Sequence, residues 1–227
     1  MTPEGNDPAA EIRILIADDD ALVRTGIAAI LDSAPDMRIV AQAIDGREAI
    51  QAATTHRLDA VLLDIQMPRV DGIEALREIR RQRPELPIAM LTTFSDEHLI
   101  SEALGAGALG FLLKSDEPQQ LISSVRALSQ GGGAFSPRVA RWLASREHAH
   151  HRTWQARLEV TSALSPRQVE LLTHIGRGLS NPQIARVMHL SEGTVKQYVS
   201  QLLDLLNVDN RVHAAVLAYR SGLLSLD

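Results

Sequence analysis

Five polar residues in the first half of the chain end or follow short apolar runs: Asp18, Asp19, Asp64, Thr92 and Lys114. Three carboxylates brought together would repel one another unless a cation held them, and oxygen-rich sites suit Mg²⁺. A carboxylate can itself attack a phosphoryl group. A lysine and a hydroxyl beside it could stabilise the transferred charge. These residue types therefore predict a Mg²⁺-dependent phosphoryl-transfer site, provided that the fold brings them together.

The elements that would position these residues alternate between apolar runs and helical patterns. We expect strands at 12–17, 37–43, 60–63, 87–91 and 109–113. We expect a helix after each strand, at 21–32, 46–55, 72–82, 96–104 and 117–130. This alternation is typical of a doubly wound α/β fold, a five-stranded parallel sheet with helices on both faces. All strands of such a sheet end at one edge, where ligands bind, so the five residues are expected to meet there.

The chain beyond residue 160 shows helical patterns throughout. Four helices are expected, each opened by a capping residue, at Ser165, Ser180, Ser191 and Asn210. They should end near residues 176, 189, 206 and 221. Only a tight turn separates the second helix from the third, which is the spacing of a helix-turn-helix. Residues 161–227 therefore predict a small all-α helix-turn-helix domain.

The remaining segments set the expected domain boundaries. Residues 1–10 are polar, lack the basic start and apolar stretch of a signal peptide, and are expected to form a disordered lead-in. The α/β domain should span 11–130, because three glycines at 131–133 break its last helix. Residues 131–160 are expected to be a linker that contains a short helix opened by Ser136 and Pro137.

Composition excludes several classes of protein. The 227 residues include no cysteine, which rules out disulfides and thiolate metal sites and fits a cytoplasmic location. No apolar run reaches the roughly 18 residues that a membrane span needs, so no membrane association is expected. Residues 1–130 carry nine more acidic than basic residues, whereas residues 161–227 carry one more basic than acidic residue. This asymmetry indicates two parts with different tasks.

Four segments of the first part resemble the motifs of bacterial response-regulator receivers: IADDDALVR, VLLDIQMPRVDG, MLTTF and GALGFLLKS. The resemblance covers about residues 11–130 and keeps the order of the motifs. It implies that Asp64 accepts a phosphoryl group from a sensor histidine kinase. It also implies that Asp18, Asp19 and Asp64 bind Mg²⁺ together with the backbone carbonyl of Gln66.

The same resemblance assigns roles to three further residues. Thr92 and Lys114 would contact the phosphoryl oxygens, and Phe111 would be the aromatic side chain whose rotation accompanies switching. Phe111 stands where tyrosine is commoner, and Ser115 follows Lys114 where many receivers have proline. Such a protein assists its own phosphorylation and dephosphorylation but is a switch rather than a turnover enzyme.

Residues 163–218 resemble the DNA-binding domain of the LuxR/NarL group, in which SEGTVK opens the recognition helix. Apolar residues at helical spacing should face inward: Val195, Val199, Leu202 and Leu206. Lys196, Gln197, Ser200 and Gln201 should face outward, and their side chains can reach bases or phosphates. The resemblance assigns base contacts to Lys196, Gln197 and Ser200, and backbone contacts to Thr194 and Tyr198.

This predicted recognition helix departs from the family pattern in its charge. Tyr198 stands where the family usually has histidine, and Leu205 stands where it usually has lysine. The helix therefore has a single lysine, and the electrostatic attraction of one copy to DNA should be weak. We accordingly expect a phosphorylated homodimer to bind a double-stranded operator with two half-sites.

Three alternatives stay open. The chain could be a phosphorylation-independent dimeric transcription factor that uses the receiver as a scaffold. It could be an aspartate-dependent phosphatase, although those enzymes place a second aspartate where Gln66 stands. The helix-turn-helix could also serve protein contacts only.

Overall fold

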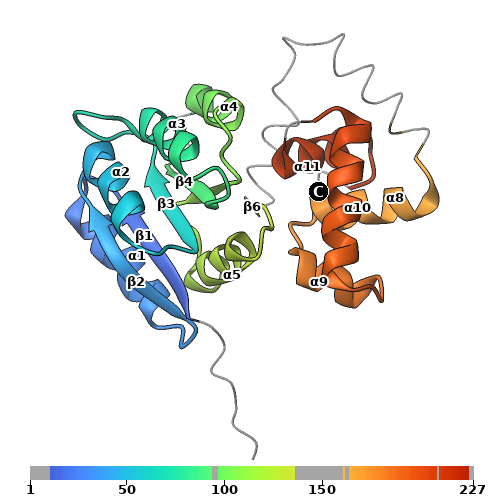
Figure 1. The fold of residues 1–227 in the computed structure, drawn as a ribbon, viewed down its shortest axis with the longest axis horizontal. Coiled ribbons are helices and arrows are strands. Elements are labelled where there is room, and N and C mark those ends of the chain that lie inside the picture. The colour runs from blue at the N-terminus through green and yellow to red at the C-terminus, as the bar shows by residue number, and fades with distance from the viewer. Residues whose placement is uncertain (1–10, 94–96, 136–160, 162–163, 209, 225–227) are drawn as a thin grey trace, which may run out of the picture.

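The computed structural model describes two domains, drawn in Figure 1. The described residues are 11–93, 97–135, 161, 164–208 and 210–224. A β-sheet between two layers of helices forms the N-terminal domain, and helices form the C-terminal domain beside it. The expected disordered lead-in and the expected short helix in the linker lie outside the described residues.

The sheet confirms the predicted doubly wound fold. Its strands are β1 (Ile12–Ala17), β2 (Met37–Ala43), β3 (Ala60–Asp64), β4 (Ile88–Thr92) and β5 (Gly110–Leu113). They run parallel in the order β2-β1-β3-β4-β5. All residues of β3, β4 and β5 are buried, as expected for parallel strands covered on both faces.

A sixth strand, β6 (Ala134–Phe135), extends the sheet beyond the five strands that were predicted. It pairs in parallel with β5, with Ala134 opposite Gly110. These residues were expected to belong to a linker, because two residues are too short for a strand pattern. The left-handed conformation of Gly131, with a φ of 71°, ends the preceding helix and lets the chain return to the sheet edge.

Helices follow the strands on both faces of the sheet. They are α1 (Ala21–Asp32), α2 (Gly46–Thr55), α3 (Gly72–Gln82), α4 (Glu97–Gly105) and α5 (Pro118–Ser129). Apolar residues of α1 and α5 pack with Ile14 and Ile16 on one face. Those of α2, α3 and α4 pack with Leu15 and Ala17 on the other. This alternation along β1 is the two-residue period of a strand covered on both sides.

Aspartates cap the N-termini of three of these helices. The carboxylates of Asp20, Asp45 and Asp71 accept hydrogen bonds from backbone N–H groups in the first turns of α1, α2 and α3. Asp20, which directly follows Asp18 and Asp19, is therefore a capping residue.

The C-terminal domain consists of α8 (Pro166–Gly176), α9 (Asn181–Val187), α10 (Glu192–Leu206) and α11 (Arg211–Arg220). Capping boxes of Ser165 with Gln168 and of Ser180 with Gln183 start α8 and α9. The turn between α9 and α10 contains His189, whose φ of 52° is left-handed. The four predicted apolar residues of α10 are buried, which confirms the inward face of this helix.

The close approach of α3 to the end of β3 generates a stability prediction. A Cβ atom on Gly72 would lie 1.9 Å from the carbonyl oxygen of Asp64. Gly72→Ala must therefore displace backbone, and we expect it to lower the free energy of unfolding by about 2 kcal/mol or more. Urea unfolding followed by circular dichroism measures this change.

Gly26→Ala in α1 is the matched control. No atom lies within 4 Å of the added methyl group at this exposed helical position. Alanine should raise stability there by up to about 1 kcal/mol. Equal stabilities of the two variants would contradict the close packing at Gly72.

Candidate functional site

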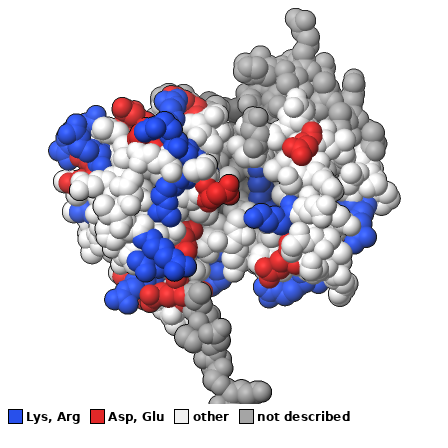
Figure 2. Space-filling model, viewed as in Figure 1, with Lys and Arg blue, Asp and Glu red and all other residues white. Residues whose placement is uncertain are grey.

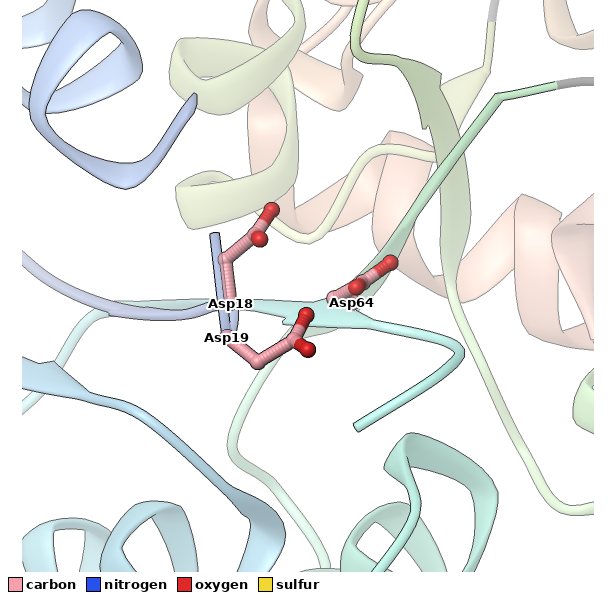
Figure 3. A group of neighbouring side chains, drawn as sticks. All are labelled: Asp18, Asp19 and Asp64. Carbon is pink, nitrogen blue, oxygen red and sulfur yellow. The ribbon is translucent and has the colours of Figure 1, made fainter. Parts of the chain in front are cut away.

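Three carboxylates meet where β1 and β3 end (Figure 3). Asp18 and Asp19 follow β1, and Asp64 is the last residue of β3. One carboxylate oxygen from each residue lies within 4.8 Å of the others. Asp18 and Asp64 are buried, whereas Asp19 is exposed. The strand register explains why they are close. Ala17 of β1 pairs with Leu63 of β3, so the residues that follow them, Asp18 and Asp64, are neighbours.

Lys114 and Thr92 lie at the same edge of the sheet. The Nζ atom of Lys114 is 2.9 Å from a carboxylate oxygen of Asp18 and 2.9 Å from one of Asp64. Thr92 ends β4 and is fully buried, and it pairs with Leu113, directly before Lys114. The structure thus brings together the five residues that the sequence placed at strand ends.

Burial and neighbouring charges shift the pKa values of both Asp64 and Lys114. Burial raises the pKa of Asp64 to about 6, against the lowering effect of Lys114, and the charges of Asp18 and Asp19 add to the rise. Burial would lower the pKa of Lys114, but its contacts with Asp18 and Asp64 outweigh this effect and raise that pKa. At neutral pH the Asp64 carboxylate is therefore charged and lies beside a charged ammonium group.

The donor set fits a divalent cation. Three carboxylates supply hard oxygen ligands, and mutual repulsion contributes to the raised pKa of Asp64, which a cation would relieve. Gln66 lines the same cavity of about 650 Å³, together with Asp19, Asp64 and Lys114. The cavity therefore has room for a cation and a phosphoryl group next to Asp64.

Contacts that the sequence analysis missed hold the loop between β3 and α3. The N–H of Gly72 donates to the carbonyl of Ile65 at 3.0 Å. Arg69 has a left-handed φ of 68°, and its guanidinium contacts the buried carboxylate of Asp45 at the start of α2. No periodicity or motif signals this pair, because its partners are 24 residues apart and lie in two loops.

Phe111 lies in β5, opposite Met90 of β4, and is fully buried. This position places it in the apolar core behind the acidic edge. The packing accounts for an apolar side chain at this position.

The α10 helix presents the outward side chains that the sequence predicted. Lys196, Gln197, Ser200 and Gln201 are exposed, and Thr194 and Tyr198 are partly buried. The guanidinium carbon of Arg167, on α8, lies 5.5 Å from the centroid of the Tyr198 ring, a contact that the sequence did not signal. On the face seen in Figure 2, the C-terminal helices show few charged side chains, consistent with the low net charge of this domain.

A cleft between the two domains reaches one side of α10. Its lining includes Lys196 and Ser200 from α10, and Arg80, Arg83 and Glu85 from the end of α3 and the loop that follows. The side chain of Asn210, before α11, also donates to the carbonyl of Leu104 in α4, at 3.5 Å. Part of the predicted DNA-binding surface therefore faces the N-terminal domain in this structure.

Comparisons with known proteins agree with both domains. Residues 14–126 match the family model of the response regulator receiver domain, and residues 162–218 match that of bacterial regulatory proteins of the LuxR family. The transcriptional regulatory protein YxjL of Bacillus subtilis is 36% identical over 214 residues, which cover 94% of this chain and 98% of that protein. The response regulator protein VraR of Staphylococcus aureus is 32% identical over 213 residues, or 94% of this chain and 99% of that protein.

Solved structures give the same result. The crystal structure of the response regulator ChrA, from a heme-sensing two-component system, is 35% identical. It matches with a TM-score of 0.52 and covers 95% of this chain and 100% of its own. Within the part of the chain that the structure describes, no helix is both long and apolar enough to cross a bilayer. Both domains, their order and the matched length show that the chain belongs to the response regulators that regulate transcription, in which a receiver domain precedes a LuxR-type helix-turn-helix.

Proposed function

We propose that the chain is a phosphorylation-switched transcription factor of the cytoplasm. A sensor histidine kinase phosphorylates Asp64, and this modification controls the binding of α10 to operator DNA as a homodimer. The observation that carries the proposal is the position of Asp64, which lies beside Asp18 and Asp19 and 2.9 Å from the Lys114 ammonium. A structural aspartate would not need this charged setting at the wall of a cavity.

The phosphoryl transfer would use the residues at the strand ends. An oxygen of Asp64 attacks the phosphorus of a kinase phosphohistidine, so that an O–P bond replaces the P–N bond and the imidazole leaves with the electron pair. Lys114 then donates to a phosphoryl oxygen, and the Thr92 hydroxyl contacts another. Mg²⁺, held by Asp18, Asp19, Asp64 and the Gln66 carbonyl, would supply charge neutralisation during attack and leaving.

The switch would follow from the new charge on Asp64. Thr92 moves toward the phosphoryl oxygens, and Phe111 rotates into the space left behind it. The surface of α4 and β5 changes with them, and α4 carries the Leu104 carbonyl that Asn210 contacts. Phosphorylation would thereby favour a state in which the domains separate and Lys196 and Ser200 leave the cleft, a shift between two populations.

The output would be DNA recognition by α10. Lys196, Gln197 and Ser200 would contact base edges in the major groove, and Gln201 lies exposed beside them. Thr194 and Tyr198 would contact the backbone. Because one copy of this domain carries little positive charge, two copies on two half-sites would supply the affinity.

The Mg²⁺ site is tested without phosphorylation or DNA. Mg²⁺ at about 100 times its dissociation constant should raise the free energy of unfolding by about 2.7 kcal/mol, because the folded chain binds it and the unfolded chain does not. Asp19→Asn should abolish this gain by removing a ligand. Differential scanning calorimetry with and without Mg²⁺ measures both.

Asp20→Asn is the control for the Mg²⁺ site, since asparagine caps a helix as well as aspartate and Asp20 stands outside the carboxylate cluster. It should keep the stabilisation by Mg²⁺. A loss of stabilisation in Asp20→Asn equal to that in Asp19→Asn would contradict the assigned ligands.

The switch itself is tested by comparing Asp64→Asn with the unchanged chain. Both are incubated with Mg²⁺ and beryllofluoride, and binding to an operator fragment, selected with the treated protein, is measured by fluorescence anisotropy. We expect tighter binding and dimerisation only for the unchanged chain and for Asp20→Asn. Equal binding of Asp64→Asn would favour a phosphorylation-independent factor with the receiver as a scaffold.

A further inference from the structure

The strongest unexplained contact of the C-terminal domain joins two helices beside the predicted DNA-binding surface. Arg167 lies in the first turn of α8, and its guanidinium carbon is 5.5 Å from the centroid of the Tyr198 ring on α10. Arg167 is exposed, and Tyr198 is partly buried. No ion pair of Arg167 with an acidic residue occurs among the described residues. The charge of Arg167 is therefore available to a ligand.

Several other basic residues of this domain have different surroundings. Arg211 is only 4% exposed, and its guanidinium donates to Asn181 and to the carbonyl of Leu179. Arg177 lines a cavity with residues of α5 in the receiver domain. Lys196 is the only basic residue in the sequence of α10. Arg186 is exposed on α9, where its Nε donates to the carbonyl of Pro182. Arg167 thus adds a positive charge that directly contacts the recognition helix.

The chemistry of Tyr198 explains how this charge is held. The face of a tyrosine ring carries partial negative charge and attracts a guanidinium, typically by about twofold to fivefold in an equilibrium constant at exposed sites. Histidine, the usual residue of the family at this position, would repel Arg167 whenever the imidazole is protonated. A guanidinium stacked on a ring keeps its N–H groups free to form two parallel hydrogen bonds with a phosphate.

We propose that Arg167 is a DNA-phosphate-binding residue, positioned at the flank of the recognition helix by the ring of Tyr198. The inference rests on the proposed DNA binding by α10 and extends it to a residue of α8. A helix in the major groove lies between two sugar-phosphate strands, separated by a groove about 12 Å wide. Side chains at the flank of that helix therefore meet phosphates, while Lys196 and Gln197 point to the bases.

The position of this pair relative to the receiver differs from that of Lys196. Lys196 and Ser200 line the interdomain cleft, whereas Arg167 and Tyr198 are not among the residues that line it. The phosphate contact should therefore be open to solvent before the domains separate. Arg167 would contribute to the weak, sequence-independent binding of the unphosphorylated chain as well as to specific binding.

The experiment measures binding of the full chain, treated with Mg²⁺ and beryllofluoride, to a labelled random-sequence duplex of roughly 30 base pairs, enough for two half-sites. Anisotropy titrations at several salt concentrations give the slope of log K against log salt. For Arg167→Gln we expect this slope to fall by about 0.9 per bound protomer and the affinity to fall about tenfold.

Variants of Tyr198 separate the ring from its hydroxyl. Tyr198→Phe keeps the ring face and should retain the salt slope. Tyr198→Leu removes the face and should lower the affinity by about twofold to fivefold, the contribution of the ring to holding the guanidinium. The double variant Arg167→Gln, Tyr198→Leu should bind no more weakly than Arg167→Gln alone, because the ring acts through the guanidinium.

Two reference variants make the outcome decisive. Arg81→Gln removes an exposed charge on α3 of the receiver and should leave the slope unchanged. Lys196→Gln reports on α10 itself. A normal slope for Arg167→Gln beside a reduced one for Lys196→Gln would overturn this inference alone, and no binding by the unchanged chain would overturn the DNA-binding proposal as well.

Discussion

The rest of the structure depends on the contact of the Lys114 ammonium with the carboxylates of Asp18 and Asp64. Two unit charges about 4 Å apart near a protein surface interact by roughly 4 kcal/mol, so three converging carboxylates would destabilise this edge without a counter-charge. Lys114 offsets part of the repulsion, yet the pKa of Asp64 stays raised at about 6. Lys114 therefore makes the carboxylate cluster compatible with the folded state, and the remaining repulsion still favours the binding of a cation.

Close backbone contacts and one ion pair restrict the movement of the backbone around this cluster. A methyl group at Gly72 would collide with the carbonyl of Asp64, and one at Gly46 would come within 2.5 Å of the carbonyl of Val70. Arg69 adds a charged contact with Asp45 across the same two loops. In the proposed switch, Asp64 would keep its position in this frame when its charge changes, and movement would be transferred to Thr92, Phe111 and the surface beyond them.

The sequence predicted the acidic site well because parallel strands obey a simple geometric rule. Every strand end opens on one edge, so Asp18, Asp64 and Lys114 could be placed together from their positions after apolar runs. Arg69 with Asp45, and Arg167 with Tyr198, could not be predicted, since each pair joins segments whose separation follows no period. The strand β6 was missed for a related reason: two residues carry no pattern, and pairing with β5 alone defines them.

The two domains also differ in how much energy each can contribute to a switch. In the proposed switch, phosphorylation would concentrate a large charge change at one buried aspartate, whereas DNA binding would draw on a domain whose basic residues barely outnumber its acidic ones. If the intrinsic affinity is weak, as proposed, a modest bias toward the state in which Lys196 and Ser200 line the cleft would prevent DNA binding. A ligand or modification that favours one state by about 5.5 kcal/mol reverses a 99:1 population. In the proposed switch, a weakly charged recognition helix would thus favour control, because closure of the cleft would compete with only a weak attraction of α10 to DNA.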